Sequence, residues 1–194
     1  MVSSRTPGGA TLADLLAIPE GQRRHEVIDG VLVEKQAASG AHGKAQGRLN
    51  AKLYPYDRRP GGRSPGGWHF LTEVEVELAP NQIVRPDVAG WRRERMPTVP
   101  REVPIHVRPD WVCEILSPTN ATNDTIRKKR AYHAAGVAHY WLLDPIEQGL
   151  SVLRRTPEGY LEVLNALSGE RVHAEPFDEI ELEVGVLFGE DETD

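Results

Sequence analysis

A strand, a helix and a second strand that follow one another closely constrain the fold of this chain more than any other feature. Residues 110–116 form an apolar run that predicts a buried strand, and residues 138–144 predict another. The segment of about 122–135 between them has helical spacing, and Gly136 suits the end of a helix. A strand, a crossover helix and a further strand together predict a mixed α/β fold.

Length and composition are those of one globular domain that is large enough to bury a core. The chain has 194 residues, 39% of them hydrophobic, and a net charge of -6. Any contact with a nucleic acid would therefore depend on a local basic patch. The single cysteine, Cys113, excludes an internal disulfide and a cysteine-rich metal site. The N-terminal residues contain no apolar stretch long enough for a signal peptide or a membrane span, so we expect a cytoplasmic protein without membrane contact.

Further strands and one more helix are predicted along the rest of the chain. Alternation around Asp29-Gly30 predicts a tight hairpin, and residues 40–57 predict a helix. Residues 68–78 alternate as one strand, and residues 150–164 predict a second hairpin. The alternating strand carries three glutamates on one face, which we interpret as a solvated face and not as a metal site. These are Glu73, Glu75 and Glu77.

Three carboxylates lie among apolar neighbours, where an uncompensated charge is costly. Glu114 lies in the buried strand at 110–116, Asp87 in the apolar run at 83–91, and Glu26 just before the predicted turn. Each of them alone could accept backbone N–H bonds or pair with an arginine. Together at the edge of a sheet they would repel one another unless a cation shared the site. Oxygen ligands without cysteine favour Mg²⁺ or Mn²⁺.

Two such acids, a divalent ion and a nearby lysine form a layout that suits phosphodiester hydrolysis. The ion acidifies a water molecule and offsets charge on the scissile phosphate. The lysine orients the nucleophile or stabilises the charge that develops in the transition state.

The spacing of these acids also resembles a known nuclease pattern. RPD, followed 27 residues later by CEILS, resembles the PD-(D/E)xK motif. Within that superfamily the chain is similar to the Uma2 family of restriction-endonuclease-like proteins, over residues 24–188. The matching segments are HEVIDGVLV, the histidine of GAHGKAQGRL, RPDVAGW, CEILSPTNATNDTIRKKRAY, GVAHYWLLDP and FDEIELEVGVLF.

The resemblance implies a fold and a division of the chain. The fold is an α/β, restriction-endonuclease-like mixed β-sheet flanked by helices, with additional β-hairpins. Residues 1–23 would form an N-terminal extension with a short helix, residues 24–188 the Uma2-like domain, and residues 189–194 an acidic disordered tail.

The resemblance also implies roles for the acids. Asp87 and Glu114 would be metal ligands together with the backbone carbonyl of Ile115, and Glu26 would be a supporting acid. The chain departs from the ExK pattern at Leu116, which stands where the motif places its lysine.

The helix that follows is the expected source of the missing amine. At 100° per residue, one stripe of this helix holds Asp124, Lys128, Ala131, Tyr132 and Ala135, and its alanines indicate close packing that turns Lys128 inward. The Uma2 pattern D…K…Y falls on Asp124, Lys128 and Tyr132 and supports this reading. Lys129 lies about a quarter-turn away. Alternatively, Asp124 and Lys128 form only a surface pair.

These features predict a Mg²⁺-dependent endonuclease that hydrolyses phosphodiester bonds in DNA. His42, where Uma2-like sequences also have histidine, would contact phosphate or shape the site, or else be a partly exposed residue at a helix start. The alternative function is an inactive nuclease-like scaffold that binds nucleic acid or a partner, which Leu116 and the negative net charge favour. The resemblance also makes a homodimer the expected assembly.

Overall fold

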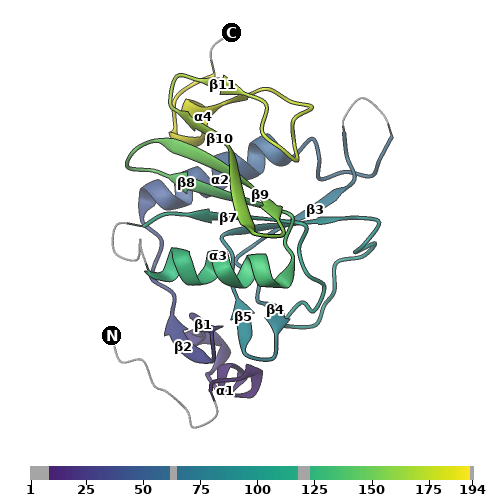
Figure 1. Ribbon diagram of the computed structural model, residues 1–194, viewed down its shortest axis with the longest axis vertical. Helices are drawn as coiled ribbons and strands as arrows, with labels where there is room; N and C mark the ends of the chain where they lie inside the picture. Colours follow the sequence, from purple (N-terminus) through teal and green to yellow (C-terminus); the bar gives the residue numbers. More distant parts are fainter. Residues whose placement is uncertain (1–8, 62–64, 118–122, 193–194) are drawn as a thin grey trace.

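A six-stranded mixed sheet forms the centre of the molecule (Figure 1). The computed structural model describes residues 9–61, 65–117 and 123–192. The strand order is β10-β9-β8-β7-β6-β3, and every neighbouring pair is antiparallel except β7 and β8. The strands are β3 (Trp68–Thr72), β6 (Val88–Arg92), β7 (Trp111–Ile115), β8 (His139–Asp144), β9 (Gly149–Thr156) and β10 (Gly159–Leu167).

The parallel pair results from the helix between its two strands. α3 (Asn123–Ala135) lies between β7 and β8 in the chain and crosses over one face of the sheet (Figure 1). Gly136 follows it with φ of 81°, a left-handed conformation that commonly ends a helix. The predicted strand–helix–strand unit and the mixed α/β class are therefore confirmed.

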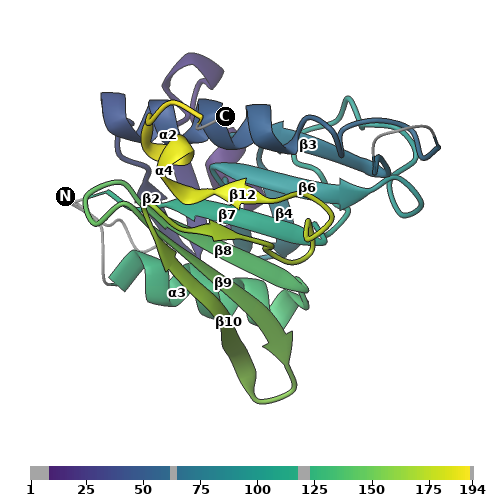
Figure 2. The same cartoon turned by 90° about the horizontal axis from the view of Figure 1, so that it is seen from above.

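Helices cover both faces of this sheet (Figure 2). α2 (Gly40–Leu53) and α4 (Val184–Phe188) lie on one face, and α3 lies on the other. Trp111 of β7 belongs to the core on the α2 side, whereas its neighbour Val112 packs with Tyr132 of α3. Because successive strand residues point to opposite faces, β7 is buried on both sides.

An aromatic cluster around Phe177 fills the core on the α2 side. Phe177 is 2% exposed, and its ring centre lies within 5.6 Å of five other aromatic ring centres. These rings belong to Tyr56, Trp68, Phe70, Trp111 and Trp141. Such contacts between aromatic rings add to the stabilisation from burial.

A second sheet of four strands lies at the lower end of Figure 1. Its order is β2-β1-β5-β4. Asp29 and Gly30 have φ of 52° and 68°, as a two-residue turn of mirror-image type requires, so the predicted hairpin is confirmed. α1 (Leu12–Leu16) packs its Leu15 against Val27 and Ile83 of this sheet. The strands are β1 (His25–Ile28), β2 (Val31–Glu34), β4 (Val76–Ala79) and β5 (Gln82–Val84).

The prediction of one strand over residues 68–78 is wrong, because the chain bends at Glu73. Glu73 has φ of 55°, and the bend separates β3 in the large sheet from β4 in the small sheet. The three glutamates therefore do not share a solvated face. Glu75 is 9% exposed and pairs with Arg23 at 3.0 Å, and Glu73 lines a cavity at the junction of the sheets.

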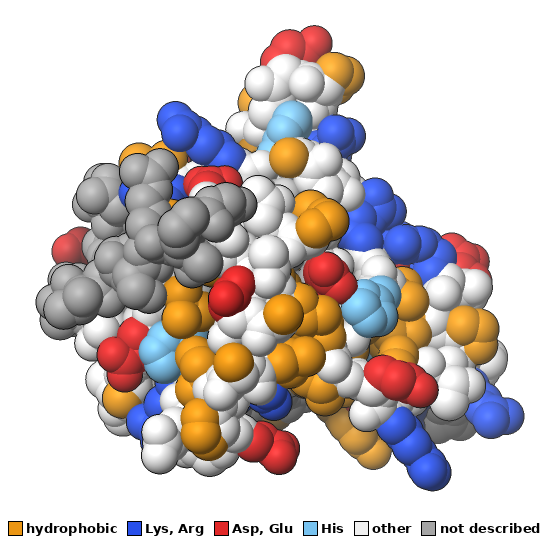
Figure 3. Space-filling view, turned by 90° about the horizontal axis from the view of Figure 1, so that it is seen from below, with side chains coloured by type: hydrophobic (Ala, Val, Ile, Leu, Met, Phe, Trp, Pro, Cys, Tyr) orange, Lys and Arg blue, Asp and Glu red, His pale blue; other side chains and the backbone are white. Residues whose placement is uncertain are grey.

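Short elements complete the described chain. They are a 3₁₀ turn (Glu20–Gln22) and a pair of strands, β11 (Arg171–Val172) and β12 (Leu182–Glu183). Over the described ranges, no helix is long and apolar enough to cross a membrane. Seen from below, the molecule shows hydrophobic side chains near the centre of this face, with charged side chains of both signs around them (Figure 3). The division at residues 23 and 188 stays a prediction.

We expect Phe177→Ala to lower the free energy of unfolding by about 3–5 kcal/mol, because it leaves a cavity among five aromatic rings. Leu161→Ala is the control, since Leu161 on β10 is 52% exposed and its loss should change stability by about 0.5 kcal/mol or less. Urea unfolding measures both variants. Equal stabilities would contradict the central position of Phe177 in the core.

Candidate active site

The register of the large sheet brings Asp87 next to Glu114. Val88 of β6 pairs with Cys113 of β7, so the residue before Val88 stands opposite the residue after Cys113. The Ile115 N–H donates to Asp87 Oδ2 at 2.6 Å. Asp87 is 1% exposed and Glu114 is 8% exposed. The two acids predicted as a pair from the sequence thus lie together in the interior.

Glu26 reaches the same place from the small sheet. It lies on β1 and is 1% exposed. Its Oε1 accepts the Arg85 N–H at 2.6 Å and lies 2.9 Å from Lys128 Nζ. Its Oε2 is buried and has no hydrogen-bond partner among the described residues. The junction of the two sheets therefore holds a third buried acid with one free oxygen.

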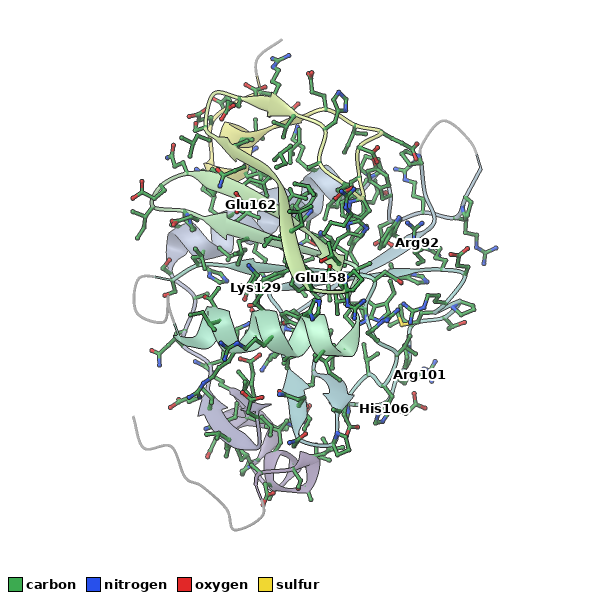
Figure 4. All side chains as sticks on the ribbon, in the orientation of Figure 1. Arg92, Arg101, His106, Lys129, Glu158 and Glu162 are labelled. Carbon is green, nitrogen blue, oxygen red and sulfur yellow. The ribbon has the colours of Figure 1, made fainter. Side chains whose placement is uncertain are left out.

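α3 supplies the cation that these acids share. Lys128 is 5% exposed, and its Nζ lies 3.2 Å from Glu114 Oε2 as well as close to Glu26. Tyr132 donates its O–H to Glu114 Oε1 at 2.5 Å. The alternative that Lys128 belongs only to a surface pair is wrong, because the side chain is buried. Lys129 is half-buried on the same helix (Figure 4), and the side chain of Asp124 lies outside the described residues.

Burial and charge shift the pKa values of these groups in different directions. Burial raises the pKa of Glu114 to about 7, although the charge of Lys128 acts to lower it. Burial would also raise the pKa of Asp87, but the contact with His42 and the charges of Lys35 and Lys128 hold that pKa well below its usual range. Burial acts to lower the pKa of Lys128, but Glu114 and Glu26 outweigh it and raise that pKa. Asp87 therefore stays ionised to a lower pH than Glu114.

Two residues that sequence reasoning missed complete the cluster. Lys35 follows β2 and places its Nζ 2.8 Å from Asp87 Oδ1 and 2.9 Å from Glu73 Oε2. A signal for Lys35 existed, because the register of the predicted hairpin sets it opposite Arg24, on the same face as Glu26. The sequence holds no comparable signal for Glu73, because its position depends on the bend between the sheets.

His42 adds a nitrogen donor to these oxygens. It lies in the first turn of α2, where its N–H donates to the Ser39 side chain at 3.2 Å. The residue is 7% exposed, and its Nε2 has no hydrogen-bond partner among the described residues, although Asp87 Oδ1 lies 3.3 Å away. The contact with Asp87 raises the pKa of His42. The alternative of a partly exposed histidine at the helix start is therefore wrong.

Three of these side chains could hold a metal ion. One atom each of His42, Glu73 and Asp87 lies within 4.8 Å of the other two. The Nε2 of His42 in its neutral form and two carboxylates fit a divalent cation such as Mn²⁺. Among the described residues, no other three such donors converge in this way.

A cavity of about 350 Å³ lies against this cluster and gives it access to a ligand. Its lining includes Asp87, Glu114, Lys128 and Ile115, together with Leu116 beside Glu114. The hydroxyl of Tyr140, another lining residue, is buried without a hydrogen-bond partner in the described structure. The predicted use of the Ile115 carbonyl as a metal ligand stays a prediction.

Comparisons with known proteins agree with this fold. The family model Uma2, described as "Putative restriction endonuclease", matches residues 12–185. The solved structures include a "putative nuclease belonging to DUF820" from Anabaena variabilis, with a TM-score of 0.70 and 22% identity. The alignment covers 92% of this chain and 97% of that one. No curated protein matches the sequence. The family model confirms the expected similarity to restriction-endonuclease-like Uma2 proteins, and the structural likeness confirms the expected fold.

The raised pKa of Glu114 predicts how stability changes with pH when metal is removed by EDTA. Because the pKa of Glu114 is higher in the folded state than its ordinary value of 4.5, the protonated carboxyl favours folding at low pH. This contribution is complete below pH 4.5 and is lost as the pH rises to about 7. The stability of the parent relative to Glu114→Gln should therefore fall by roughly 3 kcal/mol across this window. Urea unfolding at several pH values measures the difference.

The control for this comparison is Glu158→Gln. Glu158 lies in the turn between β9 and β10 (Figure 4), and its side chain is exposed to solvent, unlike that of Glu114. Its substitution should leave the pH dependence of the parent unchanged. If Glu114→Gln behaves in the same way, the carboxyl of Glu114 does not hold a proton near neutral pH.

Proposed function

Because the chain belongs to the Uma2 family of restriction-endonuclease-like proteins, we propose that it is an endonuclease that uses Mg²⁺ or Mn²⁺ to hydrolyse phosphodiester bonds in DNA. The buried acid pair at the cavity is the main support for this proposal. Asp87 and Glu114 are buried side by side at the wall of a cavity, with Lys128 and Glu26 in contact. Buried ionisable groups with shifted pKa values at the wall of a cavity are typical of functional sites.

Asp87 and Glu114 would hold the cation, with the Ile115 carbonyl as a further ligand. The N–H of Ile115 fixes Asp87 Oδ2, which leaves Oδ1 toward His42 and Lys35. When bound, a divalent cation would acidify a water molecule and offset negative charge on the scissile phosphate.

Lys128 and Glu26 would assist the reaction from their place next to Glu114. Lys128 lines the cavity, where its ammonium would stabilise charge that develops on the phosphate or orient the nucleophile. The free Oε2 of Glu26 would support a water molecule or a second ion. Tyr132 would orient Glu114 through its O–H bond. His42 would bind metal or phosphate, and Asp124 and Lys129 stay secondary candidates.

Charge supports an anionic ligand in spite of the negative net charge of the chain. Arg24 and Arg85 line the cavity together with Lys35 and Lys128. This local concentration of cations would attract phosphate groups. A homodimer that presents two such sites to a duplex, and a location in the cytoplasm, remain further parts of the proposal that rest on the sequence.

We expect Asp87→Asn and Glu114→Gln each to lower metal-dependent cleavage by about 10²-fold or more, because each removes a charge that would hold the cation. The assay offers plasmid, linear, single-stranded and branched DNA with Mg²⁺ or Mn²⁺, and EDTA serves as the blank. Circular dichroism checks that both variants fold. If both cleave as fast as the parent, the assignment of these two acids is wrong. DNA binding by the parent without cleavage under any condition would favour the inactive scaffold.

Lys128→Met should reduce cleavage far more than Lys129→Met, since only Lys128 contacts the buried acids. The two substitutions remove the same charge from neighbouring positions of α3, so a general loss of DNA attraction affects them alike. Because Lys128→Met leaves two buried acids without their cation, its folded fraction is measured by urea unfolding and used to normalise the rate. Equal normalised rates would exclude a role for Lys128.

A further inference from the structure

Lys35 stands in the position that a metal ion would need. Its Nζ contacts four oxygen atoms, which are Asp87 Oδ1 at 2.8 Å, both carboxylate oxygens of Glu73 at 3.0 and 2.9 Å, and the Arg85 carbonyl at 2.7 Å. Asp87 and Glu73 are also two of the three side chains that could hold a cation with His42. The ammonium and a metal ion therefore require the same oxygens.

His42, the third member of the group, turns its free ring edge toward Asp87. His42 Nε2 is buried and lies 3.3 Å from Asp87 Oδ1, at the long end of the range for a hydrogen bond and without good hydrogen-bond geometry. Lys35 cannot use this nitrogen as a partner when His42 is protonated, because an ammonium and an imidazolium both carry only donors. A divalent cation, in contrast, accepts the imidazole nitrogen and both carboxylates as ligands.

Glu114, the other acid proposed to hold the cation, has to give up more contacts than Glu73 before it can reach a metal ion. Both oxygens of Glu114 are engaged, because Lys128 contacts each of them and Tyr132 donates to Oε1. Glu73, by comparison, is kept in place by Arg85, whose Nε lies 3.4 Å from Glu73 Oε2 and also donates to the Glu73 carbonyl. Glu73 can therefore lose its contact with Lys35 and keep its position.

We propose that Lys35 is an internal counter-cation at a His42–Glu73–Asp87 metal site, and that a divalent cation binds there only by displacing the Lys35 ammonium. This inference rests on the proposed metal-dependent function. Lys35 can leave without disturbing the backbone, because its N–H stays bonded to the Arg24 carbonyl at 2.6 Å. The displaced side chain would enter the adjoining cavity, which it already lines, and would there face a bound phosphate.

Competition of this kind has a measurable consequence for metal affinity. Lys35→Met removes the competing charge and keeps a side chain of similar length. Mn²⁺ binding to the full-length protein without nucleic acid is measured by titration calorimetry and by electron paramagnetic resonance. The dissociation constant should fall by about tenfold or more, since a unit charge a few ångströms from the ion no longer opposes it.

Lys44→Met is the matched control for this variant. Lys44 lies on α2, two residues from His42, and its side chain is exposed. The substitution removes the same charge from the surface and should leave Mn²⁺ binding nearly unchanged. An equal gain in affinity in both variants would show a general effect of net charge and would overturn the proposal.

Glu73→Gln provides a test that does not depend on the folding of Lys35→Met. If Glu73 is a ligand, this variant binds Mn²⁺ about tenfold more weakly than the parent, and Glu77→Gln on β4 does not. If the metal is held by Asp87 and Glu114 alone, Glu73→Gln loosens Lys35 and leaves the affinity equal or higher. That second result would overturn the proposal.

Parallel cleavage assays separate this inference from the proposed function. Metal-dependent cleavage with equal Mn²⁺ affinity in the parent and in Lys35→Met refutes the role of Lys35 and leaves the nuclease proposal standing. Absence of Mn²⁺ binding in all variants refutes both.

Discussion

The buried carboxylate of Asp87 is the group on which the arrangement of the site depends. Asp87 is 1% exposed, and a charge at that depth requires donors and cations around it. These come from three different parts of the fold: the N–H of Ile115 in β7, the ammonium of Lys35 after β2, and His42 at the start of α2. One charge therefore ties the large sheet, the small sheet and a helix to each other.

A second network repeats this principle beside the first, at the same junction of the two sheets. Glu26 of the small sheet and Glu114 of the large sheet share Lys128 of α3. Removing one partner of such a buried pair lowers stability by more than the intact pair contributes, because the remaining charge is buried without solvent or a partner. The acids that would serve a reaction thus also connect the two sheets to α3.

A cluster of carboxylates must be compatible with a stable fold in the metal-free protein. Carboxylates that converge without a cation repel one another, and two lysines reduce that repulsion in the chain by itself. In the proposed metal site the same compensation would limit metal binding, since an ion would compete with an ammonium for the oxygens of Asp87 and Glu73. The stability of the metal-free protein and the affinity for an ion would therefore be opposed at this site.

Local periodicity in the sequence determined much of this protein. It predicted the strand–helix–strand unit, the hairpin at Asp29-Gly30 and the inward stripe of α3 that buries Lys128. Only the tertiary structure decided that Glu73 and Lys35 meet at Asp87. The bend at Glu73 has a positive φ and moves the chain from one sheet to the other, and alternation along a strand cannot reveal such a change. Periodicity reports which face a residue occupies, whereas the packing of two sheets decides which faces meet.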